Sequence, residues 1–159
     1  MVRISHYSAS VAVILAGFGA LGAAYYGEFV EHLVPCPLCY IERWPYRIMI
    51  VLGVLGMVLP RRIARASLWL ASVTMFTDAC IALVHVGAER HWWQSPLPEC
   101  NIAPAQFGAL PLRPSASCDR PVFPVHGLPV SFATLDLLYA LVTGAIISVY
   151  LIQTRERRQ

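Results

Sequence analysis

Four long apolar stretches constrain the fold of this chain more than any other feature. Each is about twenty residues long, enough at about 1.5 Å per residue for a helix to cross a hydrocarbon core of about 30 Å. The predicted helices cover residues of about 8–28, 38–59, 66–88 and 130–152. With 57% hydrophobic and 13% charged residues, the 159-residue chain is too apolar for a soluble domain of its size. The sequence predicts an all-α membrane protein, a single domain over residues 1–159 that forms a four-transmembrane-helix bundle, and it carries no nucleic-acid signal.

The first apolar stretch, the uncharged run Ser8–Tyr26, admits two interpretations. Arg3 ahead of it and the small residues near Ala20–Ala24 are typical of a secretory signal peptide, but the run is long for a signal core. Tyr25 and Tyr26 at its end suit a membrane interface. We favour a permanent membrane helix.

The arginines predict the orientation of the bundle. With four spans, one side of the membrane receives seven arginines and a single acid, Glu156. These arginines are Arg3, Arg61, Arg62, Arg65, Arg155, Arg157 and Arg158. By the positive-inside rule that side is cytoplasmic, so both termini are expected there. Residues 60–65 are expected to form a tight basic turn on the same side.

The segment of about 89–129 is predicted to be a long irregular loop on the opposite side, because it holds eight of the twelve prolines and shows no periodicity. It contains Cys100 and Cys118, while Cys36 and Cys39 stand at the start of the second helix. Four of the five cysteines therefore lie on the non-cytoplasmic side, where disulfides persist. The fifth, Cys80, is expected to behave as a small buried apolar residue within the third helix.

The spacing of the cysteines indicates redox chemistry. Cys36 and Cys39 are separated by two residues at a helix start, where unpaired backbone N–H groups and the helix dipole favour a thiolate. This pair is expected to exchange disulfides readily. A bond between Cys100 and Cys118 would close a nineteen-residue loop, worth roughly 3 kcal/mol if it were purely structural. In a flexible loop such a bond is also easily reached by thiolates.

An arginine stripe follows the first cysteine pair. Cys39, Arg43 and Arg47 fall at i, i+4 and i+8 on the predicted helix, so they descend along one face into the bilayer. An arginine there costs several kcal/mol unless it snorkels or has a partner. A carbonyl-bearing, membrane-soluble electron acceptor beside Cys39 would suit Arg43, because a guanidinium stabilises negative charge developing on oxygen. For Arg47 we favour snorkelling to lipid phosphate.

Two acids fall inside predicted helices. Asp78 lies near the middle of the third helix, where an unpaired carboxylate is costly, and we expect it to hydrogen-bond to Thr74, Thr77 or a neighbouring helix. Asp136 is in the first turns of the fourth helix and is expected to complement the helix dipole.

These features together resemble the bacterial disulfide-bond oxidase family DsbB. They are the four helices, Cys-x-x-Cys followed by Tyr-Ile-Glu-Arg, an acid after the third helix, and two further cysteines before the fourth. The likeness covers nearly the whole chain. It implies a quinone-dependent protein-disulfide oxidoreductase of the bacterial inner membrane, with its cysteine loops in the periplasm.

The resemblance also implies an order of electron transfer. A soluble thioredoxin-fold oxidase of the DsbA type would be reoxidised by the Cys100/Cys118 disulfide, with Cys100 forming the mixed disulfide. Cys118 would then exchange with Cys36. Cys39 would face ubiquinone, or menaquinone without oxygen, assisted by Arg43. We expect the protein to be a monomer whose partners are this oxidase, lipid and quinone.

The residues that the resemblance places around the quinone, besides the four catalytic cysteines, are Arg43, Glu42, Glu89 and His91. In the family an acid and a histidine are adjacent after the third helix, whereas here the order is Glu89-Arg90-His91, so the histidine is displaced by one position. His85, a turn earlier, is an alternative quinone neighbour, although we favour a hydrogen bond within the bundle for it.

Two rival functions remain open. The four loop-side cysteines would form a non-catalytic zinc site that clamps the loop to the bundle. Alternatively, the chain would be a vitamin K epoxide reductase-like enzyme, a family in which the Cys-x-x-Cys comes late and the shuttle pair early. That order is the reverse of the one seen here.

Overall fold

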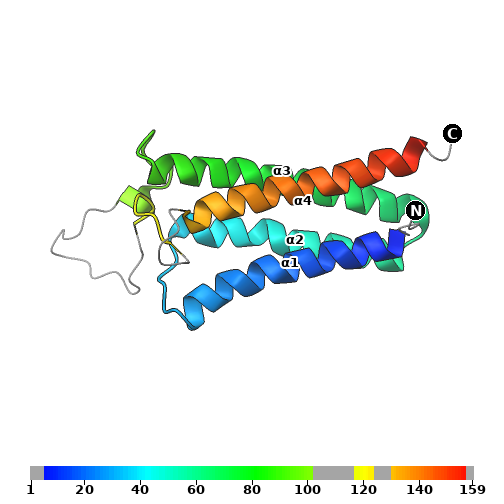
Figure 1. The fold of residues 1–159 in the computed structure, drawn as a ribbon, viewed down its shortest axis with the longest axis horizontal. Helices are drawn as coiled ribbons and strands as arrows, with labels where there is room; N and C mark the ends of the chain where they lie inside the picture. Colours follow the sequence, from blue (N-terminus) through cyan, green and yellow to red (C-terminus); the bar gives the residue numbers. More distant parts are fainter. Residues whose placement is uncertain (1–5, 102–116, 124–129, 157–159) are drawn as a thin grey trace.

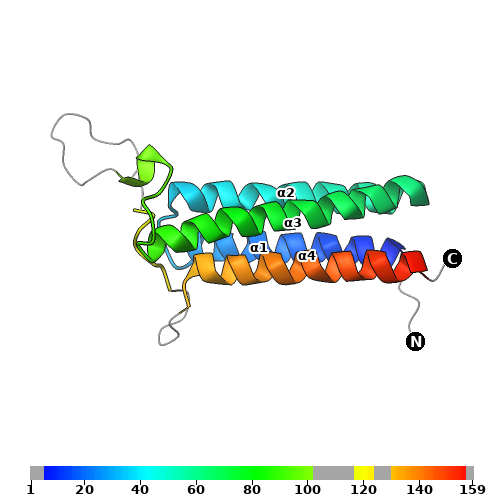
Figure 2. The ribbon, with the colours of Figure 1, turned by 90° about the horizontal axis from the view of Figure 1, so that it is seen from above.

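The computed structural model describes residues 6–101, 117–123 and 130–156, and the regular secondary structure of these residues is all helical, as predicted. The elements are α1 (His6–Phe29), α2 (Pro37–Val58), α3 (Arg61–Glu89), the 3-10 helix η1 (Pro98–Asn101) and α4 (Phe132–Glu156). The four α-helices lie side by side along the long axis (Figures 1 and 2). The start of α1, the α2–α3 turn and the end of α4 lie at one end of the bundle, and η1 lies at the other (Figure 1).

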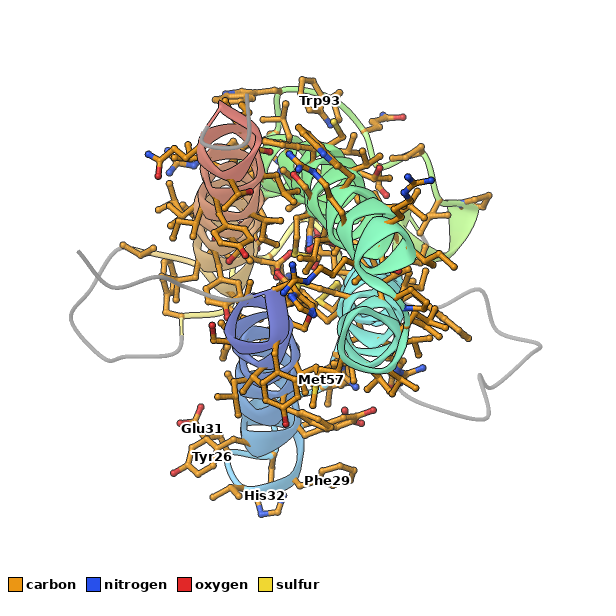
Figure 3. All side chains as sticks on the ribbon, turned by 90° about the vertical axis from the view of Figure 1, so that its right-hand side faces the viewer. Tyr26, Phe29, Glu31, His32, Met57 and Trp93 are labelled. Atoms are coloured by element: carbon orange, nitrogen blue, oxygen red, sulfur yellow. A yellow bond between two sulfur atoms is a disulfide. The ribbon has the colours of Figure 1, made fainter. Side chains whose placement is uncertain are left out.

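Three of these helices are long and apolar enough to cross a membrane: α1, α3, and α4 over Phe132–Thr154. The remaining helix, α2, has 22 residues but carries three charged side chains, Glu42, Arg43 and Arg47. Large apolar side chains point outward on all four helices, as expected of surfaces that face lipid. Viewed along the bundle, Tyr26 and Phe29 project away from the other helices at the end of α1 (Figure 3).

The tight turn between α2 and α3 is confined to Leu59 and Pro60, and the prediction that it extends over residues 60–65 is wrong because α3 begins at Arg61. Pro60 stands just before the first helical residue, and its carbonyl accepts a hydrogen bond from the Ala64 N–H at 2.9 Å. Proline suits this position because a helix start needs no N–H donor there. Arg65 then donates to the Leu151 carbonyl at 2.7 Å, which ties the start of α3 to the last turns of α4.

Small residues bring α1 and α2 into close contact. A Cβ atom built on Gly17 would lie 2.6 Å from Ile50 Cγ1 and 3.2 Å from the Tyr46 carbonyl oxygen. A Cβ atom on Gly53 would lie 2.6 Å from Ile14 Cγ1. Such glycines allow two membrane helices to approach through their backbones. This packing places the start of α2 beside the end of α1, where the candidate site lies.

We expect Gly17→Leu to lower the thermal unfolding midpoint of the detergent-solubilised protein. The added side chain would overlap α2, and overpacking of this kind costs about 1–3 kcal/mol. Gly19→Leu is the matched control, because a Cβ atom at Gly19 meets nothing within 4 Å. Circular dichroism during heating measures both variants. An equal loss in the two would contradict the close α1–α2 contact.

Asp78 is fully buried, but it does not hydrogen-bond to the threonines on its own helix. Thr74 and Thr77 instead donate to the Leu70 and Val73 carbonyls at 2.8 and 3.0 Å. A threonine in a helix has a backbone acceptor one turn earlier, so it needs no carboxylate. Of the expected partners of Asp78, Thr74 and Thr77 are therefore wrong, and the groups that interact with it lie on neighbouring helices.

The second acid, Asp136, has a partner on another helix. Its Oδ1 atom accepts a hydrogen bond from the Tyr46 hydroxyl of α2 at 2.6 Å. Asp78 interacts electrostatically with both Tyr46 and Asp136, although neither of its oxygens has a hydrogen-bond partner among the described residues. The three side chains thus form a polar cluster between α2, α3 and α4.

Cys80 lies on the exposed surface of α3, so the expectation that it is buried is wrong. Its helical phase turns it away from Asp78, which is two residues earlier and faces the core.

Candidate functional site

The first cysteine pair lies at the start of α2. Cys36 is the residue before the helix and has an extended backbone, with φ −76° and ψ 164°. Its sulfur accepts a hydrogen bond from the Cys39 N–H at 3.2 Å, and Pro37 occupies the first turn. The two cysteines form a disulfide, with their Cα atoms 5.2 Å apart. The pair therefore lies at the positive end of the helix dipole.

The second pair is also a disulfide and packs directly on the first. Cys100 and Cys118 are bonded, with Cα atoms 5.1 Å apart. Cys36, Leu38, Cys100 and Cys118 form one buried cluster, and Cys39 packs against it. All four predicted catalytic cysteines therefore meet at one end of the bundle. In this oxidised form the four cysteines offer no free thiolates, the form in which zinc binds cysteine, so the four-cysteine zinc clamp is not formed while both bonds are closed.

Local hydrogen bonds hold the second pair in place. Cys100 belongs to η1, and its N–H donates to the Leu97 carbonyl at 3.1 Å. Segment 117–123 is anchored to the start of α4, because the Phe132 N–H donates to the Val122 carbonyl at 2.9 Å. Asp119 follows Cys118 and accepts a hydrogen bond from the Ser117 hydroxyl, which holds the pKa of that carboxyl below its usual value. The loop beside Cys118 thus carries a stable negative charge.

His85 connects the first cysteine pair to two buried acids. Its Nε2 atom lies 3.4 Å from Cys36 Sγ, and its Nδ1 atom lies 2.8 Å from Glu42 Oε1. Glu89 is one turn further along α3, with Oε1 4.0 Å from the same Nε2 atom. Ser131 donates to Glu89 Oε2 at 2.5 Å. The favoured hydrogen bond of His85 within the bundle is thus present, and the same imidazole also contacts the redox-active sulfur.

Arg43 is buried and has partners within the protein. It donates from Nη1 to Glu28 Oε2 of α1 at 2.6 Å. Its guanidinium carbon also lies 4.9 Å from the centre of the Tyr25 ring and 5.0 Å from that of Tyr40. An ion pair and two cation–π contacts fix the orientation of this side chain. Its Nε atom is buried and has no hydrogen-bond partner in the described part of the chain.

Arg47 lies on the exposed surface of α2. It donates to the Tyr25 hydroxyl at 2.9 Å and stacks over the Trp44 ring at 5.2 Å. Arg47 therefore differs from Arg43, which lies one helical turn earlier and is buried.

A cavity of about 120 Å³ opens beside the first pair. Its polar and sulfur-bearing wall consists of Cys36, Cys39, Glu42, Arg43, His85, Glu89, Arg120 and Asp136 among others. Apolar side chains of α1 and α4, including Leu21, Ala24 and Phe132, form another part of the wall. An apolar pocket with a few convergent polar groups is the usual form of a cofactor site. Arg43 contributes a guanidinium to this wall, a group that suits a carbonyl oxygen of such a cofactor.

The structure brings Arg43, Glu42 and Glu89 to this cavity but does not bring His91 there. His91 is exposed, two residues beyond the end of α3, in a turn with φ 56°. The chain has left the helix before it reaches this residue, so its side chain no longer follows the face of Glu89. His85 takes the place beside the sulfur. Helical periodicity could have identified His85, because residues at i and i+4 share a helix face and His85 precedes Glu89 by four residues.

Comparisons with known proteins agree with this site. Residues 6–150 match the family model described as "Disulfide bond formation protein DsbB". The chain is 26% identical to disulfide bond formation protein B of Herminiimonas arsenicoxydans, over 93% of this chain and 94% of that protein. It is 29% identical to the protein of the same name in Nitrosospira multiformis, over 94% and 92% of the two chains.

A relative from a Shewanella species, also named disulfide bond formation protein B, is 30% identical over 84% of this chain and 73% of its own length. A shorter match, 32% identical over 71 residues, covers 45% of this chain and 41% of an uncharacterised protein of Rickettsia prowazekii. No solved structure matches significantly. Because the family match extends over nearly all of the chain and includes both cysteine pairs, this protein belongs to the DsbB family of membrane disulfide bond formation proteins.

Proposed function

We propose that this protein oxidises a periplasmic thioredoxin-fold dithiol oxidase of the DsbA type and passes the electrons to a membrane quinone, either ubiquinone or menaquinone. The observation that carries the proposal is the contact between the two disulfides, with the cavity on the α1 and α4 side of the first pair. The Cys100–Cys118 pair lies in the loop segment, and the Cys36–Cys39 pair lines the cavity. This arrangement favours a relay from protein thiols to a lipid-soluble acceptor over a vitamin K epoxide reductase-like reaction.

The relay consists of disulfide exchanges in which atoms and electrons balance. A thiolate of the reduced partner attacks the Cys100 sulfur, forms a mixed disulfide and releases the Cys118 thiolate. The second partner thiol then closes the partner disulfide and leaves Cys100 reduced. Cys118 attacks Cys36 and releases the Cys39 thiolate, and Cys100 resolves this bond so that Cys36 and Cys39 become the dithiol. The packing of these cysteines in one buried cluster supports exchange without large movement of the bundle.

A bound quinone supplies the two-electron oxidant that restores the Cys36–Cys39 disulfide. Partners of the DsbA type have potentials of about −120 mV, so their reoxidation needs a more oxidising acceptor, and each 30 mV is worth about 1.4 kcal/mol. The residues present fit such a group. Arg43 would offer its guanidinium to a carbonyl oxygen, and the apolar side chains of α1 and α4 would contact the ring.

His85 and Glu42 prepare the thiol chemistry. The imidazole Nε2 at 3.4 Å from Cys36 is placed to take the thiol proton and return it. Glu42 holds the ring through Nδ1 at 2.8 Å, which fixes its orientation. Neither residue needs to move during this transfer.

We infer that α2 is a fourth membrane span. Its charges Glu42 and Arg43 are buried and paired with His85 and Glu28, so they do not face lipid. With four spans, the end bearing the α2–α3 turn and its arginines is cytoplasmic. The cysteine end is then periplasmic in the bacterial inner membrane, and the protein acts as a monomer.

Reconstitution tests this function. The purified protein, a reduced thioredoxin-fold oxidase of the DsbA type and a short-chain ubiquinone are mixed without oxygen, and free thiols and quinol are both quantified. We expect one quinol for every two thiols lost, over many turnovers. Catalytic thiol loss at the same rate without added quinone, or quinol formation without thiol loss, would contradict the proposal.

A further inference from the structure

Three potential metal ligands converge at the first cysteine pair. The Cys36 and Cys39 sulfurs and one ring nitrogen of His85 all lie within 4.8 Å of one another. Zinc binds thiolate sulfur at about 2.3 Å and imidazole nitrogen at about 2.0–2.1 Å, in a tetrahedral arrangement. Ligand atoms in such a site are separated by roughly 3.3–3.8 Å. Once the disulfide is reduced, these three atoms need only small shifts to surround one ion.

The surroundings of His85 match those of a metal-bound histidine. Glu42 Oε1 lies 2.8 Å from Nδ1, so the carboxylate holds the proton on that nitrogen. The Nε2 lone pair then points toward Cys36. Metal-binding histidines regularly have a carboxylate on the other ring nitrogen, which orients the ring and raises its basicity. Both Glu42 and His85 are buried, so water does not compete for this contact.

The remaining coordination position would face the cavity. Glu89 Oε1 lies 4.0 Å from His85 Nε2, and all three candidate ligands line the cavity wall. Water or Glu89 is therefore available as a fourth ligand. The position of both cysteines at the start of α2 favours their thiolate forms, which are the forms that bind metal.

We propose that the reduced Cys36–Cys39 dithiol and His85 bind one zinc ion, in a site that exists only when this disulfide is open. Binding releases the two thiol protons to solvent and transfers no electrons. The ion holds both thiolates, so they are no longer free to form a disulfide. A consequence that rests on the proposed function is that zinc arrests the relay in its reduced state. This site differs from the four-cysteine clamp because it needs neither Cys100 nor Cys118.

Cobalt titration tests the site directly. The purified protein is reduced, freed of reductant without oxygen, and titrated with Co²⁺, whose thiolate charge-transfer and tetrahedral d–d absorption bands report the ligands; Zn²⁺ is then added to displace it. We expect one Co²⁺ per reduced chain and none in the oxidised chain. Cys36→Ser or Cys39→Ser should remove the spectrum. Glu42→Gln keeps all three ligands and should weaken binding about 10–100-fold.

Two control variants define the ligand set. Cys80→Ser and the double variant Cys100→Ser/Cys118→Ser should bind Co²⁺ as the unmodified protein does. Equal binding to oxidised protein, an unchanged affinity and spectrum in His85→Gln, or loss of binding in the double variant would overturn the proposal. Because the titration contains neither quinone nor partner, a bound metal in a protein that fails to oxidise thiols would count against the proposed function and leave the metal site standing.

Discussion

Replacing Cys39 by serine is expected to abolish quinone-dependent oxidation of a reduced thioredoxin-fold partner, with a loss of about 10³-fold or more. Serine forms no disulfide, so the pair beside the cavity could neither accept electrons from Cys118 nor lose them again. The measurement is steady-state thiol loss and quinol formation in the reconstituted system. The same variant should retain the first exchange, at Cys100, so a mixed disulfide with the partner should still be trapped.

Cys80→Ser is the matched control for this experiment. Cys80 is the free cysteine of the described chain and lies on the outer surface of α3, away from both pairs. Its replacement should leave the turnover number unchanged. Normal turnover in Cys39→Ser would refute the assignment of Cys36 and Cys39 as the pair that faces the quinone.

Removing the guanidinium of Arg43 is expected to raise the apparent KM for quinone about 10–100-fold. Hydrogen bonds to charged groups contribute about 1.5–3 kcal/mol, and about 1.4 kcal/mol corresponds to a tenfold change in affinity. Arg43→Ala removes the guanidinium from the cavity wall together with the ion pair to Glu28. Arg43→Lys keeps the charge but loses the planar set of donors, so it should recover only part of the affinity.

Glu28→Gln separates the two roles of Arg43. It removes the ion pair and leaves the guanidinium in place between Tyr25 and Tyr40. We expect a smaller rise in KM than in Arg43→Ala, and thermal unfolding of each variant should be recorded to account for lost packing. An unchanged quinone KM in a folded Arg43→Ala variant would leave this arginine a purely structural role.

The helices and the cysteine pairs could be predicted because their signals are local. Apolar length predicted all four α-helices, and two-residue spacing at a helix start predicted a reactive cysteine pair, which the structure shows as a disulfide. The main error in the helices was the start of α3, which begins at Arg61 because Pro60 initiates a helix as readily as it makes a turn. Local patterns determine such elements because each hydrogen bond spans only a few residues.

The contacts between these elements depend on how each helix is rotated about its axis relative to its neighbours. Local sequence patterns do not predict that rotation. Arg43 was expected to face lipid or a ligand alone, yet α1 supplies Glu28 as its partner. The resemblance places His91 at the quinone, but α3 ends before it, and the phase of the helix turns His85 toward Cys36 and Glu42 instead. Residue types and spacing by themselves determined that the chain is a membrane thiol protein. Only the tertiary structure decided that the two disulfides pack together, with the His85 imidazole and the Glu42 carboxylate beside them. These side chains lie 40 or more residues apart in the sequence, so they meet only when the bundle folds.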